Sequence, residues 1–98
     1  MSSMNREWQG TLLAAGANTL ATKGGAVLKG FFISAKGTSP TIRVDDAAAS
    51  NATNTIVAQF IPTGVGFLDL GGIGLGTGLF IKVASCTATA IWAPRAGL

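Results

Sequence analysis

Very few residues of this chain have side chains that could carry out chemistry, and their types argue against catalysis. The sequence contains no histidine, so the usual general base and the commonest nitrogen ligand of metal ions are both missing. The single cysteine, Cys86, therefore has no histidine to activate it and no second thiolate with which to bind a metal. The simpler interpretation is that Cys86 is a small packing or turn residue. We expect that the protein is not an enzyme and uses no metal or cofactor.

The carboxylates are equally sparse, and they are Glu7, Asp45, Asp46 and Asp69. Asp45 and Asp46 are adjacent, so they point to opposite faces if the strand before them continues. Their simplest role is to accept hydrogen bonds from backbone N–H groups at the start of the following loop. The alternative is a calcium site with oxygen atoms from Asp45, Asp46 and Asn51, although the spacing is not that of a known calcium loop.

The glycine-rich run at residues 71–78 superficially resembles a phosphate-binding loop. Its glycines at 72, 74 and 76 are spaced by two, which is not the dinucleotide-binding fingerprint, and the run contains no lysine. An apolar strand follows it, rather than a helix whose N-terminus would bind an anion. The interpretation that we favour is a tightly turning loop between two strands.

The composition favours assembly with other protein chains. Hydrophobic residues make up 48% of the 98 residues and charged residues only 11%, which is less than half of the roughly 25% typical of soluble domains. A small protein with so few charges leaves large uncharged areas that other chains can cover. The seven Lys and Arg residues are spread singly, whereas nucleic-acid-binding proteins cluster them. We expect a homo-oligomer and no nucleic-acid partner.

Several features predict where the protein is made. Cys86 has no partner for an intramolecular disulfide, which fits synthesis in a reducing cytoplasm. Arg6 and Glu7 occupy positions at which a signal peptide would be apolar. No apolar run approaches the roughly 18 residues that are needed to cross a bilayer. We therefore expect a cytoplasmic product with no membrane partner.

Short apolar runs alternate with turn residues at intervals typical of an all-β sandwich or barrel. We expect an N-terminal arm at residues 1–9 and a single β-sandwich domain at 10–98, with about eight antiparallel strands. No connection has the length or the helical periodicity of a crossover helix. The expected strands lie at residues 11–15, 18–22, 26–35, 41–45, 54–61, 65–70, 79–84 and 87–92.

Three details of these strands are specific enough to test. Gly30, inside the strand 26–35, predicts a bulge or a close approach of two backbones. The segment 36–40, with the sequence KGTSP, predicts a hairpin loop. Alternation predicts that Leu79, Ile81 and Val83 point inward, and that Ala88, Ala90 and Trp92 share one face of the last strand while Thr87, Thr89 and Ile91 share the other.

Aromatic residues supply the candidate interface. Phe31 and Phe32 are adjacent, so one of them must face away from the core if the strand is regular. We assign Phe32 to an interface, together with Arg6 and Trp8 of the arm. The arm has two interpretations, a disordered tail with a stray tryptophan or a segment that docks on a neighbouring molecule.

A set of turn and strand motifs occurs in a recognisable order along the chain. They are GFFIS at 30–34, GTS at 37–39, TIRVDD at 41–46, FLDL at 67–70 followed by GGI, and GLFIKV at 78–83. In this order they resemble small virion proteins of tailed bacteriophages that have a jelly-roll sandwich. The resemblance covers roughly residues 26–92 and carries over no binding residue.

The resemblance implies a function in the virion. Such proteins decorate, or cement, the outer surface of the head, often as trimers, or they form modules of fibres and tail spikes. We expect a head decoration protein on the capsid surface, with the major capsid protein as its partner and a homotrimer as its oligomer. The alternatives are a host-adhesion or carbohydrate-binding module of a fibre or tail, and a tail or baseplate connector.

Overall fold

The computed structural model describes residues 8–49 and 55–94. Within those ranges every regular element is a strand, so the prediction of an all-β protein is confirmed. The strands form one antiparallel sheet, and their number is six rather than about eight. They are β1 (Gln9–Leu13), β2 (Asn18–Lys23), β3 (Ala26–Asp46), β4 (Thr55–Phe60), β5 (Gly66–Leu75) and β6 (Gly78–Pro94). The described residues contain no helix that is long and apolar enough to span a membrane.

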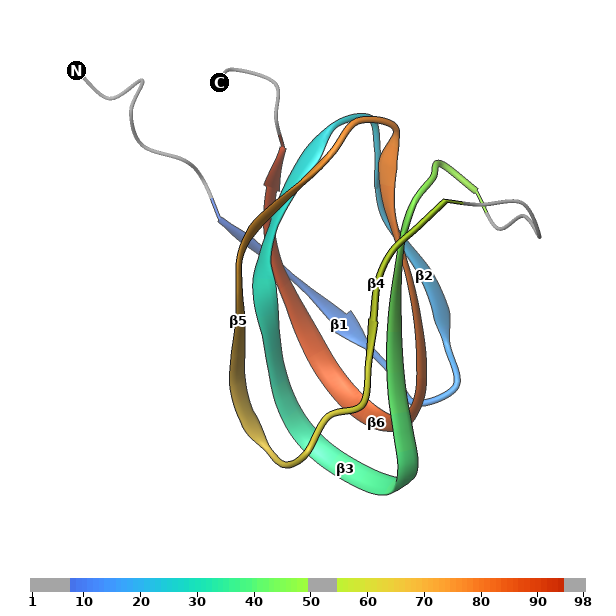
Figure 1. Ribbon diagram of the computed structural model, residues 1–98, viewed down its shortest axis with the longest axis vertical. Coiled ribbons are helices and arrows are strands. Elements are labelled where there is room, and N and C mark those ends of the chain that lie inside the picture. The colour runs from blue at the N-terminus through green and yellow to red at the C-terminus, as the bar shows by residue number, and fades with distance from the viewer. Residues whose placement is uncertain (1–7, 50–54, 95–98) are drawn as a thin grey trace.

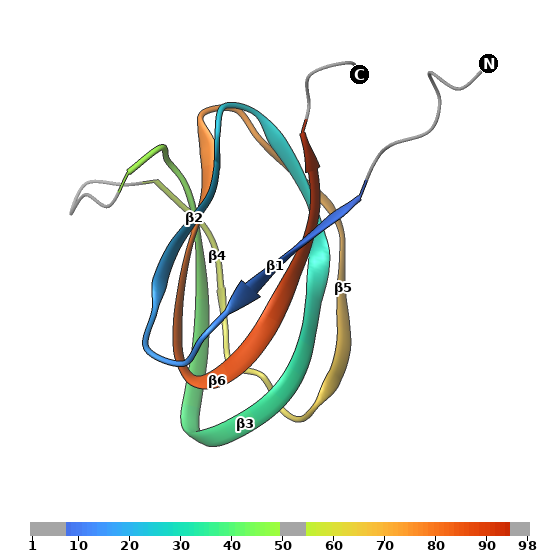
Figure 2. The ribbon, with the colours of Figure 1, turned by 180° about the vertical axis from the view of Figure 1, so that it is seen from behind.

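Two long strands, β3 and β6, organise the sheet. They pair antiparallel from Ala26 opposite Pro94 to Asp46 opposite Leu79. β5 and β1 flank the half of this pair that is nearest Ala26, while β4 and β2 flank the half that is nearest Asp46. Because the long pair bends in its middle, the two halves of the sheet fold toward each other, as Figure 1 and the view from behind in Figure 2 show.

The bend corrects the predicted hairpin loop at residues 36–40. The pairing passes from Lys36 opposite Cys86 directly to Thr41 opposite Ala84, so β3 continues through this segment as one strand. At the bend Ser39 has a φ of 54° and Ser85 a φ of 56°. Turn-forming residues favour a change of direction but do not decide whether the strand ends there. Here β6 bends alongside β3, and the pairing resumes on the other side.

Side chains keep facing the interior across this bend because β6 changes its alternation there. Ser85 is the one residue of β6 that the pairing skips at the bend, and the buried side chains shift there from odd to even positions, from Val83 to Cys86. The predicted alternation agrees with the burial of Leu79, Ile81 and Val83 before the bend and of Ala88, Ala90 and Trp92 after it, although Phe80 and Ala93 are buried as well.

The core lies between the two halves of the sheet. Phe31 in one half packs against Phe60 in the other, with ring centroids 5.7 Å apart. Trp92 is also buried, and its indole Nε1 donates a hydrogen bond of 2.8 Å to the hydroxyl of Thr11. A buried indole needs such an acceptor, because an unpaired buried donor costs free energy. The other large, fully buried apolar side chains are Leu13, Leu28, Ile33, Ile42, Val44, Leu75, Leu79 and Ile81.

The glycine-rich run was predicted to be a loop, and that prediction is largely wrong. Residues 71–75 belong to β5, and only Gly76 and Thr77 separate β5 from β6. Gly71 and Gly72 have φ values of 72° and 87°, a conformation that favours glycine. They form an irregularity within β5, after which its pairing with β3 continues at Ile73 opposite Leu28.

Gly30 lies at a close approach of two backbones, as predicted. The pairing of β3 shifts between Leu28 and Gly30 against both of its neighbours, β5 and β6. A Cβ atom at position 30 would overlap the backbone carbonyl oxygen of Leu68 in β5. Because both groups belong to paired backbones, neither can move aside without breaking the ladder.

Replacing this glycine should therefore destabilise the protein. We expect Gly30→Ala to lower the free energy of unfolding by about 2 kcal/mol or more, as overpacking of a rigid site does. Gly64→Ala is the matched control, because a Cβ atom there meets nothing within 4 Å. Urea denaturation followed by circular dichroism measures both variants. Equal stabilities for the two variants would contradict the close approach.

Candidate functional site

The two adjacent carboxylates are both engaged by groups of the protein itself. Asp45 is fully buried and accepts two hydrogen bonds from the guanidinium of Arg43, from Nε at 2.7 Å and from Nη2 at 3.0 Å. This contact raises the pKa of Arg43 above its ordinary value, because the hydrogen bonds to the carboxylate stabilise the charged guanidinium. Among residues 8–49 and 55–94 no cluster of three or more His, Cys, Asp or Glu side chains could hold a metal. Asn51, the third oxygen donor of the calcium alternative, lies outside the described residues.

Asp46 turns toward the connection between β5 and β6. Its Oδ1 accepts hydrogen bonds from the N–H groups of Thr77 at 2.7 Å and Gly78 at 3.2 Å, and its Oδ2 accepts one from Gly76 at 3.2 Å. The glycine-rich turn thus surrounds an anion, as a phosphate-binding loop would, but the anion is a carboxylate of the same chain. Asp46 does accept backbone hydrogen bonds, but these donors lie between β5 and β6 and not in the following loop, where the sequence interpretation placed them.

Removing this carboxylate should loosen the connection between the end of β3 and the start of β6. We expect Asp46→Ala to lower the free energy of unfolding by about 2 kcal/mol, because several N–H donors lose a charged acceptor. Asp69→Ala is the control, since Asp69 accepts one exposed hydrogen bond from the N–H of Gly71. The control should cost about 0.5 kcal/mol or less. Chemical denaturation of both variants tests the difference, and equal losses would contradict this role of Asp46.

Cys86 is a buried core residue at the bend of β6, with 2% of its surface exposed. Burial raises the pKa of its thiol, because the thiolate would lose its hydration. A thiol of this kind is a weak nucleophile at neutral pH. The position agrees with the interpretation of Cys86 as a packing residue.

The thiol should therefore be protected in the folded protein. We expect Ellman's reagent to label Cys86 slowly at pH 7, faster as the pH rises toward the raised pKa, and rapidly once guanidinium unfolds the chain. Cys86→Ala should keep the fold and the assembly of the protein. Rapid labelling of the folded protein at pH 7, or a folded Cys86→Ala variant that no longer assembles, would reveal a functional thiol.

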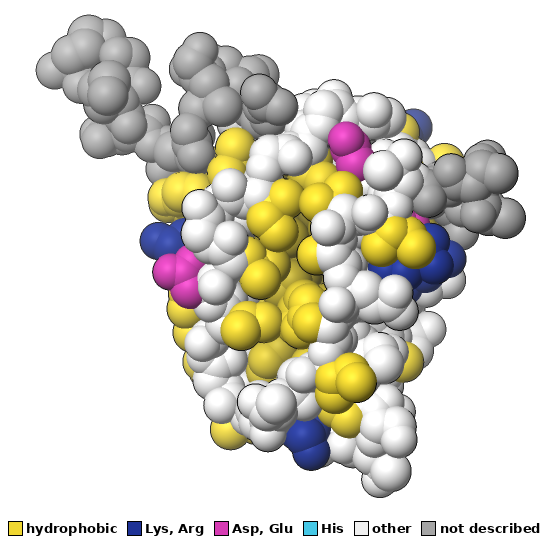
Figure 3. Space-filling view, viewed as in Figure 1, with side chains coloured by type: hydrophobic (Ala, Val, Ile, Leu, Met, Phe, Trp, Pro, Cys, Tyr) yellow, Lys and Arg dark blue, Asp and Glu magenta, His cyan; other side chains and the backbone are white. Residues whose placement is uncertain are grey.

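The described surface has an apolar groove between β4 and β5. The groove has a volume of about 750 Å³ and is lined by Ile33, residues 57–68 and Leu70. None of these lining residues carries a charge. In the space-filling view the groove is a hollowed band of hydrophobic side chains between the two strands (Figure 3).

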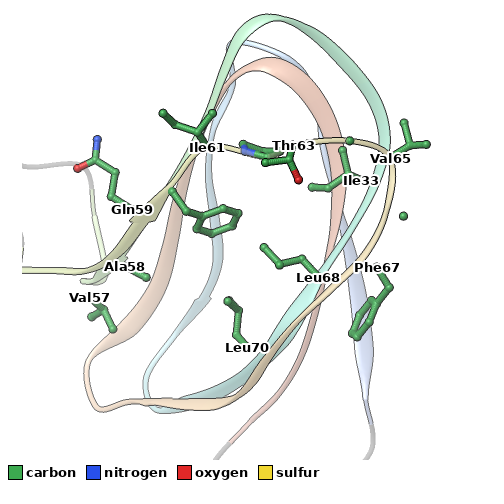
Figure 4. A pocket seen from close by; sticks show the side chains of 14 residues that line it. Ile33, Val57, Ala58, Gln59, Ile61, Thr63, Val65, Phe67, Leu68 and Leu70 are labelled. Atoms are coloured by element: carbon green, nitrogen blue, oxygen red, sulfur yellow. The ribbon is translucent and has the colours of Figure 1, made fainter.

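The two walls of the groove are strands that alternate inward and outward side chains. Leu68 and Leu70 of β5 point into the groove, and Ala58 of β4 points toward them from the other wall, whereas Phe67 and Gln59 point away (Figure 4). Within the described residues, β4 and β5 each pair with β3 alone. The groove therefore lies between two sheet edges whose backbone groups face no other strand of the described chain.

The edge of β4 carries only part of the usual protection against pairing with other chains. Natural sheets protect exposed edges with charged side chains, prolines or bulges. β4 has the sequence TIVAQF, without a charge or a proline, and Ile56 and Val57 on it are 49% and 38% exposed. The β4 edge therefore exposes apolar side chains without a charge, although its pairing with β3 contains a bulge, between Val44 and Asp45.

A second apolar surface crosses the outer face of the sheet half that contains β1 and β5. Leu12 of β1 and Phe32 of β3 both lie opposite Thr89 of β6, and Phe32 also lies opposite Phe67 of β5. Leu12, Phe32 and Phe67 are 69%, 48% and 49% exposed. We call Leu12, Phe32, Phe67 and Thr89 the outer row.

The outer row includes one of the predicted interface residues. Phe31 is fully buried while Phe32 is exposed, so the expectation that one of the pair faces away from the core is confirmed. Trp8 lies just before β1, 42% exposed, with the ammonium group of Lys29 5.3 Å from its ring centroid. Trp8 thus contacts its own sheet through a cation–π interaction, in which the positive charge of the lysine is attracted to the face of the aromatic ring. Arg6, the other predicted interface residue, lies outside the described residues, as do residues 1–7 of the arm.

The sequence interpretation missed the groove, although a signal was present. Residues 47–68 contain no Asp, Glu, Lys or Arg, and nearly all of the groove lining falls within this stretch. An uncharged stretch that includes an edge strand indicates a surface that other chains cover. The stretch alone does not predict that the edge strand lies across a groove from β5.

The comparisons with known proteins leave the function to be argued from these surfaces. No model of a known protein family matches the chain, and no curated protein sequence matches it either.

Proposed function

We propose that this protein is a structural component of a bacteriophage virion, and most specifically a decoration protein that binds the outer shell of the head as a homotrimer. The support comes from the resemblance of residues 26–92 to such proteins, from the scarcity of charge, and from the two apolar surfaces. Its fold is proposed to be a jelly-roll-like sandwich. In support of that fold, β3 and β6 each contribute to both halves of the sheet, so each half contains segments of four strands.

The observation that carries the proposal is the outer row. Leu12, Phe32 and Phe67 form one line across the sheet, on rigid strands and next to the polar Thr89. Such a mixture of exposed aromatic and polar side chains is typical of interfaces between proteins that also exist apart. Covering the exposed part of each aromatic ring contributes about 1 kcal/mol, so a single row binds weakly. A trimer that presents three rows to neighbouring capsid subunits binds far more tightly, because the later contacts are intramolecular.

The composition of the virion tests this function. Mass spectrometry of purified virions should find this chain at a copy number close to that of the major capsid protein. Phe32→Asp should reduce co-sedimentation with capsids that lack the protein by about tenfold or more, because it removes apolar contact and buries a charge. Thr38→Asp, on the exposed bend of β3, is the control and should bind normally. Absence of the chain from virions, or its presence at a few copies in the tail alone, would reject the decoration function.

A further inference from the structure

A line of polar side chains crosses the outer face of the sheet half that contains β2 and β4. Lys82 of β6 lies opposite Asn18 of β2 on one side and opposite Arg43 of β3 on the other. Arg43 in turn lies opposite Gln59 of β4. Directly opposite side chains point to the same face of a sheet, and the residues before and after Lys82 in β6 are buried in the core. We call Asn18, Lys82, Arg43 and Gln59 the polar row.

The polar row lines a recess of about 310 Å³. Unlike the groove between β4 and β5, this recess combines two cations with the amides of Asn18 and Gln59 and the hydroxyl of Thr41. All of these side chains can donate hydrogen bonds. No carboxylate is among the lining residues, so the recess brings positive charge and hydrogen-bond donors together.

Arg43 is held in a fixed orientation at the recess. The fully buried carboxylate of Asp45 accepts hydrogen bonds from its Nε at 2.7 Å and its Nη2 at 3.0 Å, while 24% of the arginine side chain is exposed. A guanidinium has more N–H groups than these two bonds use. Because its planar fork is already oriented, it loses little conformational freedom when it binds a further acceptor. Asp45 thus positions Arg43 for a ligand and also balances its charge.

Lys82 supplies the charge that stays unbalanced. Like charges directly opposite each other destabilise a sheet, and Lys82 lies directly opposite Arg43. Within residues 8–49 and 55–94, Lys82 takes part in no salt bridge. A carboxylate placed between the two cations would remove their repulsion. The recess therefore favours an acidic ligand.

The number of cations decides which acidic ligand fits. Proteins that bind nucleic acid cluster many Lys and Arg residues along the phosphate backbone. The polar row has only two cations, and Asp45 already balances one of them. At its two ends Asn18 and Gln59 offer amides, which can both donate to and accept from peptide groups. One acidic side chain of a protein, with polypeptide on either side, matches this arrangement.

The polar row and the outer row face in different directions. The core lies between the two halves of the sheet, so the outer faces of the halves point away from each other (Figure 1 and Figure 2). A partner that covers the outer row therefore leaves the polar row accessible to another molecule.

We propose that the polar row is a binding site for an acidic side chain of a partner protein, whose carboxylate lies between Arg43 and Lys82. The inference goes beyond the proposed function, because it holds whether or not the outer row binds a capsid. The two surfaces also differ in their response to salt, since salt screens the charges of the polar row and does not weaken apolar contact.

Titration with an acidic peptide tests the site. The probe is hexaglutamate with blocked termini, and hexaglutamine is the uncharged control peptide. Nuclear magnetic resonance of the full-length protein labelled with nitrogen-15 follows the backbone amides and the Nε–H of Arg43. We expect hexaglutamate to shift the signals of the polar row, with an affinity that falls about fivefold or more from low to physiological salt. Hexaglutamine should leave these signals unchanged.

Two substitutions that remove the same charge show whether the position matters. Lys82→Gln should weaken binding of hexaglutamate by about threefold or more, as loss of an exposed ion pair does. Lys36→Gln, on the exposed bend of β3, is the matched control and should bind as the wild type does. Lys82→Gln should also unfold at no lower urea concentration than the wild type, because it removes a repulsion, whereas a lysine with a structural role would lose stability.

The inference is overturned if hexaglutamate leaves the polar row unshifted, or if Lys82→Gln and Lys36→Gln weaken binding equally. It is also overturned if inorganic phosphate displaces the peptide at equal concentration, because the site then prefers phosphate to a carboxylate. If Lys82→Gln fails to fold, Gln59→Glu replaces it, with Thr38→Glu as its control and the same expected difference in binding. Absence of the chain from virions would reject the decoration function and leave this site in place.

Discussion

The pairing of β3 with β6 is the interaction on which the rest of this structure depends. β1, β2 and β3 all pair with β6, while β4 and β5 are attached through β3. The pair stays together only because both strands bend at the same place, where a Cβ atom at Gly37 would lie 3.0 Å from the carbonyl oxygen of Ser85. Left-handed backbone at Ser39 and Ser85 costs about 1–2 kcal/mol per residue. Continued pairing on both sides of the bend offsets that cost, and it gives the sheet two facing halves with one core.

Local features of the strands could be predicted from the sequence, because they depend on a residue and its immediate neighbours. The alternation in β6, the opposite orientation of Phe31 and Phe32, and the close approach at Gly30 belong to this class. The number of strands could not be predicted, since residues 36–40 suit a hairpin and a bend equally well and only the path of β6 decides between them. The groove depends on β4 and β5 ending up as edges that do not pair with each other, which is a property of the whole topology.

The three carboxylates of the described chain all accept hydrogen bonds from the chain itself. Asp45 holds Arg43, Asp46 closes the turn between β5 and β6, and Asp69 accepts a hydrogen bond within β5. The groove and the outer row offer mainly apolar side chains to anything that binds there. Contacts of this type depend little on ionic strength, because salt screens charges and does not weaken apolar burial. The assembly that we propose through these surfaces would therefore tolerate changes in the salt concentration of the surrounding solution.

The central position of β6 also determines when the chain can fold during its synthesis. Ala26 finds its partner at Pro94, and Leu13 finds its partner at Ala88, so the main contacts join residues far apart in the sequence. The nascent chain therefore holds β1, β2 and β3 without their common partner until residues 78–94 have left the ribosome. Folding of such non-local pairings is slow, because a long loop must close before any contact forms. The two halves of the sheet can therefore be joined only after β6 is available, although β4 and β5 can pair with β3 before that.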